Sequence, residues 1–140
     1  MKAGIADKLA NLERYIRLLK GYSSKEKEDI IGDPTLRGAV ERYMQLAIEV
    51  VIEIGEMIIA SDGLDKPESY KEVIEALGKA GILEKKFTAR FAPIAGLRNI
   101  LVHRYAEVDT DELYYHLTHD LGDFDSFAKQ VASYTKSRRL

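Results

Sequence analysis

Apolar residues recur every three or four positions along most of this chain, which is the spacing of one face of an α-helix. The first predicted helix ends near Gly21, and its apolar positions are Leu9, Leu12, Ile16 and Leu19. Residues 25–31 predict a short second helix, capped by one of the two serines that precede it. No segment shows the apolar–polar alternation of a β-strand, so the pattern predicts an all-α chain.

A long helix is predicted over residues 34–60. Asp33 is a favourable N-cap and Pro34 suits the first helical position, so this helix has a clear start. Several charged residues interrupt its apolar run, which excludes a lipid-facing helix and indicates a buried core helix. Its apolar surface is more than so small a bundle is expected to cover, and this favours a second copy of the chain.

Residues 67–81 and 83–104 predict the next two helices. The first of these opens at its proline, and the second contains Pro93, which should kink it. A capping box starts the last helix, over residues 109–134. Together the pattern predicts a single domain over residues 1–140, folded as an up-and-down bundle of four or five helices.

Composition narrows the possible partners and compartments. The chain has 140 residues and no cysteine, which excludes disulfides and thiolate metal sites. Its net charge is −2, whereas a domain that coats nucleic acid is usually clearly basic, so any RNA contact should be local or shared between subunits. The first residues lack the apolar run of a signal peptide, so we expect a cytoplasmic protein without membrane contact.

The candidate chemistry lies in residues 98–105, which hold Arg98, Asn99, His103 and Tyr105. Arginine offers a planar fork of donors for phosphate oxygens, and histidine exchanges protons near neutral pH. On an ideal helix the first three of these side chains fall within about 140° and can converge on one polar concavity. The alternative is structural, because cationic side chains are common at the C-terminal end of a helix.

Two further groups of polar residues have both a structural and a functional interpretation. One face of the long helix carries a polar stripe, which comprises Arg42, Gln45, Glu49, Glu53 and Glu56. Either this stripe is solvated, or it places Glu49 or Glu53 against Arg98 and so orients the arginine. His116 and His119 lie three residues apart, but two histidines without further ligands are weak evidence for zinc. We therefore expect no metal site.

Residues 96–105 read Gly-Leu-Arg-Asn-Ile-Leu-Val-His-Arg-Tyr and resemble the signature of the HEPN superfamily. Four residues separate the arginine from the histidine, and one separates the histidine from the tyrosine; this spacing is similar to that of the HepT-type toxin branch. Residues 36–49 resemble the second long helix of that branch, and residues 108–113 resemble the start of its last helix. The resemblance implies a HEPN-like bundle that forms a symmetric homodimer and acts as an RNA-cleaving toxin, without a cofactor and without DNA as a partner.

The resemblance also implies a role for each residue of the motif. Arg98 and His103 match the catalytic pair, Asn99 matches the residue that supports them, and no metal is required. Tyr105 matches the tyrosine to which an MntA-type minimal nucleotidyltransferase antitoxin attaches AMP, which silences the toxin. The alternative is a non-catalytic nucleotide-binding or adaptor subunit that docks such a nucleotidyltransferase.

The chemistry of RNA cleavage fits this motif. The 2′-hydroxyl can attack the adjacent phosphorus if a base takes its proton, an acid protonates the leaving 5′-oxygen and a cation stabilises the phosphorane. One chain offers His103 and Arg98 but no convincing second proton carrier. Two chains related by a two-fold axis offer both an acid and a base in one cleft.

Overall fold

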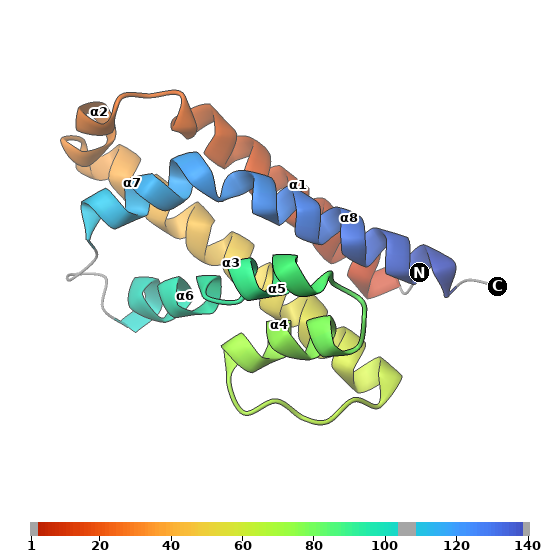
Figure 1. Cartoon of the computed structure of the whole chain (residues 1–140). Coiled ribbons are helices and arrows are strands. Elements are labelled where there is room, and N and C mark those ends of the chain that lie inside the picture. Colours follow the sequence, from red (N-terminus) through yellow and green to blue (C-terminus); the bar gives the residue numbers. More distant parts are fainter. Residues whose placement is uncertain (1–2, 104–108, 139–140) are drawn as a thin grey trace.

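The computed structural model describes residues 3–103 and 109–138, without the side chains of Ala3 and His103. This part of the chain contains helices and no strands (Figure 1). The helices are α1 (Ala3–Ser23), α2 (Lys27–Ile31), α3 (Pro34–Asp62), α4 (Tyr70–Lys79), α5 (Lys85–Phe91), α6 (Ile94–His103), α7 (Thr110–His119) and α8 (Leu121–Ser137).

The three longest helices, α1, α3 and α8, form the body of the molecule (Figure 1). Helix α1 packs between α3 and α8, while α4 and α6 pack on α3. Aromatic contacts join α5 to α8, because the Phe91 ring lies 5.5 Å from the Phe124 ring and 5.6 Å from the Phe127 ring, centroid to centroid. The prediction of an all-α bundle is confirmed.

The ends of α3 agree with the prediction from the sequence. The Asp33 carboxylate accepts hydrogen bonds from the backbone N–H of Thr35 at 2.9 Å and of Leu36 at 3.3 Å. These bonds satisfy two of the amides that a helix start leaves without partners. At the other end Gly63 adopts a φ of 67°, and its N–H donates to the carbonyl of Ile59. Glycine adopts this left-handed conformation without the strain that a side chain would cause.

Two predicted helix starts are wrong. Helix α4 begins at Tyr70 rather than at Pro67, because the Ser69 hydroxyl accepts a hydrogen bond from the Glu72 N–H at 3.2 Å and caps the helix there. Helix α2 has Glu26 at its N-cap, without a side-chain hydrogen bond, so the predicted serine cap is absent. The later start of α4 leaves residues 63–69 as a loop, and this loop borders a cavity described below.

Two of the long predicted helices are each divided in two. The helix over 83–104 is broken into α5 and α6 at Pro93, which cannot donate a backbone hydrogen bond. The helix over 109–134 is divided into α7 and α8 at Asp120. The Asp120 carboxylate there contacts the His116 ring one turn earlier. The result is eight helices in the described part instead of five main ones and a short one.

One argument for a second copy of the chain is also wrong. A single copy already covers the apolar face of α3, since side chains such as Val51 and Ile54 have no exposed surface and Ile52 is only 4% exposed. A dimer is therefore not needed to bury this helix. None of the described helices has the length and apolarity needed to cross a membrane.

Gly55 of α3 lies directly against Val73 of α4, where there is no room for a side chain. A Cβ added there would lie 2.5 Å from Cγ1 of Val73 on α4, which is too close for two carbon atoms. We expect Gly55→Ala to lower the free energy of unfolding by about 1–3 kcal/mol, because overpacking forces the helices apart. Gly38→Ala on α3 is the matched control, since nothing lies within 4 Å of its added Cβ. Urea unfolding should show the control variant unchanged or slightly stabilised; equal loss in both variants would contradict the prediction.

Candidate functional site

Helix α6 presents the motif by burying one of its sides and exposing another. Ile94, Leu97 and Leu101 are between 5% and 6% exposed and anchor the helix in the core. Through this side the helix packs on α3. Asn99 is exposed, and Arg98 lies between the two environments. The motif is thus fixed on a helix whose position is set by its buried side.

Arg98 forms an ion pair with the long helix. Its Nη2 donates to Oε2 of Glu49 at 3.0 Å, and the two side chains are 17% and 26% exposed, respectively. The second oxygen of Glu49 accepts a hydrogen bond of 3.5 Å from Nε2 of Gln45. Of the two alternatives for the polar stripe, the one that places Glu49 against Arg98 is confirmed. Glu53 instead pairs with Lys8, with 2.6 Å between Nζ and Oε2.

An aromatic ring completes the setting of Arg98. The guanidinium carbon lies 4.9 Å from the centroid of the Tyr70 ring, a cation–π distance. Tyr70 was not predicted from the sequence, because it belongs to a different helix and its spacing to the motif carries no signal. Arg98 Nε is buried and has no hydrogen-bond partner within the described residues. The carboxylate and the ring therefore fix the guanidinium, which pairs with Glu49 through Nη2.

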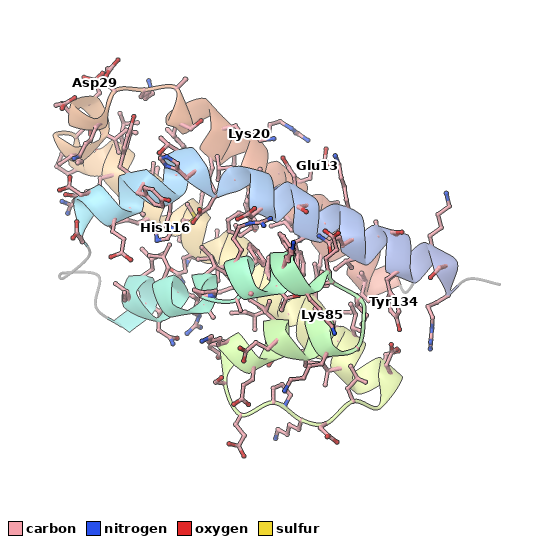
Figure 2. All side chains as sticks on the ribbon, viewed as in Figure 1. Glu13, Lys20, Asp29, Lys85, His116 and Tyr134 are labelled. Carbon is pink, nitrogen blue, oxygen red and sulfur yellow. The ribbon has the colours of Figure 1, made fainter. Side chains whose placement is uncertain are left out.

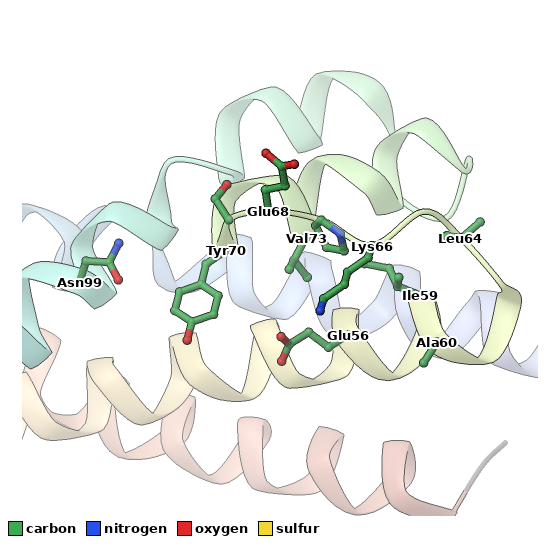
Figure 3. A pocket seen from close by; sticks show the side chains of 11 residues that line it. Glu56, Ile59, Ala60, Leu64, Lys66, Glu68, Tyr70, Val73 and Asn99 are labelled. Atoms are coloured by element: carbon green, nitrogen blue, oxygen red, sulfur yellow. The ribbon is translucent and has the colours of Figure 1, made fainter.

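Two adjoining hollows lie beside α6. The smaller, of about 250 Å³, is lined by Arg98 and Glu49, and the larger, of about 680 Å³, is lined by Asn99. Glu56 and Tyr70 border both. Arg98 and Asn99 thus line two neighbouring concavities rather than one, and the convergence of His103 with them stays a prediction. Figure 3 shows Asn99 on one side of the larger hollow and Tyr70 beside it.

The remaining residues of the motif lie at or beyond the limit of the described structure. His103 is the last residue of α6, but its side chain is outside the described part. Tyr105 belongs to residues 104–108, which are also outside it. The roles of these two residues remain predictions.

His116 and His119 lie on α7, and both line a third hollow between that helix and α5 and α6. Figure 2 shows His116 among the side chains between α7 and α6. The His119 ring stacks on the Tyr115 ring, with 4.1 Å between centroids. Across residues 3–103 and 109–138, no three histidine, cysteine or acidic side chains cluster as metal ligands.

The hydrogen bond with Asp120 raises the pKa of His116, and the nearby Glu112 carboxylate acts in the same direction, while desolvation opposes both. Because the pKa of His116 is higher in the folded than in the unfolded state, the protonated ring stabilises the fold at pH values below the unfolded pKa of about 6.5. This stabilisation is lost as the pH rises through the folded-state pKa. We expect His116→Asn to remove on the order of 1 kcal/mol of this pH-dependent stability. Urea unfolding of the wild type and of His116→Asn across pH 5–9 measures it. A wild-type stability that rises over this range relative to His116→Asn would contradict the prediction.

Comparison with known proteins places this chain in a family. A model of the family described as ribonuclease HepT-like matches residues 12–131. The chain is 28% identical over 130 residues to the tRNA nuclease HepT of Aphanizomenon flos-aquae, covering 93% of this chain and 88% of that protein. It is 29% identical over 126 residues to the mRNA nuclease HepT of Shewanella oneidensis, covering 88% of this chain and 92% of that protein.

A solved structure agrees over nearly the whole fold. It contains a tri-AMPylated HEPN toxin of Shewanella oneidensis in complex with an MNT antitoxin. The match has a TM-score of 0.86 and 26% sequence identity, and covers 95% of this chain and 99% of that one. The residues matched by the family model include α6 with its arginine and histidine, together with Glu49 and Tyr70. This chain belongs to the HepT-like ribonuclease family.

Proposed function

We propose that this protein is a metal-independent endoribonuclease toxin of a toxin–antitoxin pair. The observation that carries the proposal is the setting of Arg98, which Glu49 and Tyr70 hold at the edge of a hollow. His103 follows on the same helix. The relatives named as tRNA and mRNA nucleases support RNA as the substrate class.

The proposed reaction is a transesterification within the RNA. The 2′-oxygen forms a bond to the adjacent phosphorus, and the bond from phosphorus to the 5′-oxygen breaks. A base accepts the proton of the 2′-hydroxyl, and an acid donates a proton to the leaving 5′-oxygen. Arg98 stabilises the charge that develops on the phosphorane, and Asn99 supports the site. The products are a 2′,3′-cyclic phosphate and a 5′-hydroxyl.

Two copies of the chain complete this chemistry. One motif supplies a single histidine, whereas a symmetric homodimer supplies two, so that one acts as base and the other as acid. The outer side of α6 is available for such a contact, because Gly96 and Asn99 are exposed. The protein should therefore sediment as a dimer at micromolar concentration. A strictly monomeric species would contradict the shared site.

Control of the toxin is proposed to act through Tyr105. A cognate MntA-type nucleotidyltransferase attaches AMP to its hydroxyl and silences the site. The tri-AMPylated HEPN toxin bound to its MNT antitoxin supports this form of control in a relative.

The second candidate is a non-catalytic nucleotide-binding or adaptor subunit that docks a nucleotidyltransferase. The net charge of −2 favours it, as does the pairing of Arg98 with Glu49, which reduces the charge offered to RNA. Expression without the antitoxin separates the two candidates. A nuclease toxin arrests growth, whereas an adaptor does not.

The proposed function is tested by incubating the purified protein with a single-stranded RNA. We expect products with 2′,3′-cyclic phosphate and 5′-hydroxyl ends, formed equally fast with and without EDTA. A matched oligonucleotide with a 2′-deoxyribose at the cleavage position should resist, because it lacks the attacking hydroxyl. Loss of cleavage in EDTA, or cleavage of the deoxy substrate, would contradict the mechanism.

A further inference from the structure

The larger hollow beside α6 has the size and lining of a small-molecule site. Its volume of about 680 Å³ falls within the range of roughly 300–1,000 Å³ that is common for ligand pockets. Apolar side chains line part of it, among them Ile59 and Val73, which are 5% and 2% exposed. The loop over 63–69 and the start of α4 form the opposite wall (Figure 3). Such a cavity can accept a flat aromatic ring.

Tyr70 connects this hollow to Arg98. Tyr70 lines both hollows and is 37% exposed. The Arg98 guanidinium lies 4.9 Å from the ring centroid. A phosphate bound by Arg98 would therefore place the neighbouring nucleotide at Tyr70. Exposed aromatic rings bind nucleic-acid bases by stacking, whatever the base.

The polar groups of the hollow add selectivity to this stacking. In Figure 3 the side chains of Lys66 from the loop and of Glu56 from α3 reach into the hollow, and the Asn99 amide lies at the side. A carboxylate accepts hydrogen bonds only, an ammonium donates only, and an amide does both. The fitting base therefore presents donors to Glu56 and acceptors to Lys66 or Asn99.

Guanine has this arrangement. Its N1–H and N2–H₂ groups are adjacent donors that a carboxylate can accept together, while its O6 and N7 atoms accept from lysine or an amide. Adenine and cytosine present one amino group beside acceptors, and uracil presents a single N–H between two carbonyls.

We infer that the larger hollow binds a guanine base of the RNA, next to the phosphate held by Arg98, with Glu56 as the residue that selects it. The inference deepens the proposed function and rests on it for the choice of RNA as ligand. It assigns the loop over 63–69 to substrate selection, and it gives Tyr70 at the start of α4 a role in selection besides its contact with Arg98.

The test measures binding rather than cleavage. Guanosine, adenosine, cytidine and uridine 3′-monophosphates are titrated into the full-length protein by calorimetry or NMR. We expect guanosine monophosphate to bind about tenfold more tightly than uridine monophosphate. Glu56→Gln should lower the affinity for the guanine nucleotide about tenfold and leave that for the uracil nucleotide unchanged. Glu13→Gln, which changes a carboxylate that is 74% exposed on α1, is the matched control and should change neither.

A second pair of variants tests the stacking. Tyr70→Leu should weaken all four nucleotides, because the ring is sequence-tolerant, whereas Tyr70→Phe should retain their affinities. If the leucine variant does not fold, Glu56→Gln still decides whether the larger hollow selects guanine.

The outcomes for the pocket and for the proposed function are separable. Equal binding of the four nucleotides, or a Glu56→Gln variant with unchanged selectivity, would overturn the guanine pocket even if the protein cleaves RNA. Guanine-selective binding without cleavage of any RNA would support the pocket and contradict the nuclease function.

Discussion

His103→Ala should lower the rate of RNA cleavage by a factor of at least about 10²–10⁴, the contribution typical of one positioned general acid or base, because the variant homodimer loses both of its histidines. Arg98→Ala should lower it by about 10²–10³, because the phosphorane loses a preorganised donor. Single-turnover cleavage of one labelled oligonucleotide measures both effects. Wild-type activity in His103→Ala would show that the histidine takes no part in the reaction.

Variants of other residues near the motif give a scale for these losses of the cleavage rate. Glu49→Gln should cost less than Arg98→Ala, since the guanidinium keeps its contact with the Tyr70 ring. Asn99→Ala should also cost less, because Asn99 is expected to support the other two residues rather than react. His119→Ala on α7 is the control for loss of a histidine and should retain full activity.

Mixed dimers test whether the site is shared. A dimer of one wild-type chain and one His103→Ala chain keeps a single histidine. If one histidine acts as acid and the other as base, the mixed dimer loses one proton-transfer contribution, on the order of 10²-fold or more. If each chain acts alone, the mixed dimer should keep half of the wild-type rate, and this result would contradict the shared site.

The sequence predicts best those features that neighbouring residues determine. Asp33 and Pro34 define the start of α3 because the cap and the first helical position are adjacent. The division between α7 and α8 was missed because apolar residues continue at helical spacing on both sides of Asp120. Pro67 predicts a helix start because proline is common at the first helical position, whereas the structure shows that the Ser69 hydroxyl caps the Glu72 amide and starts the helix later.

In the candidate site, too, the features that neighbouring residues determine were predicted, and those that depend on helix packing were not. Spacing alone placed Arg98 and Asn99 on one helix beside His103, and the structure adds their hollows. The contact with Glu49 was one of two open alternatives, because a polar stripe does not reveal which helix it faces. Tyr70 could not be predicted, since only the packing of α4 on α3 brings it to the arginine.

Co-expression with a cognate nucleotidyltransferase should increase the mass of this chain by one or more AMP units, and Tyr105→Phe should abolish the increase. The tyrosine oxygen would form a bond to the α-phosphorus of ATP, with release of pyrophosphate and loss of the hydroxyl proton to solvent. The attached phosphodiester carries a negative charge close in sequence to Arg98 and competes for the cation that the RNA phosphate needs. We expect the added nucleotide to obstruct the site as well, so that one modification would act in two ways.

The same experiment distinguishes modification from simple binding. Intact-protein mass spectrometry of the purified chain gives the number of AMP units, and a growth assay gives the degree of neutralisation. Tyr115→Phe, which changes a tyrosine that is 55% exposed on α7, should retain both the mass increase and the neutralisation. Tyr105→Phe should be unmodified and remain toxic in the presence of the antitoxin. An unmodified wild-type chain that is nevertheless fully neutralised would show that the antitoxin inhibits by binding alone.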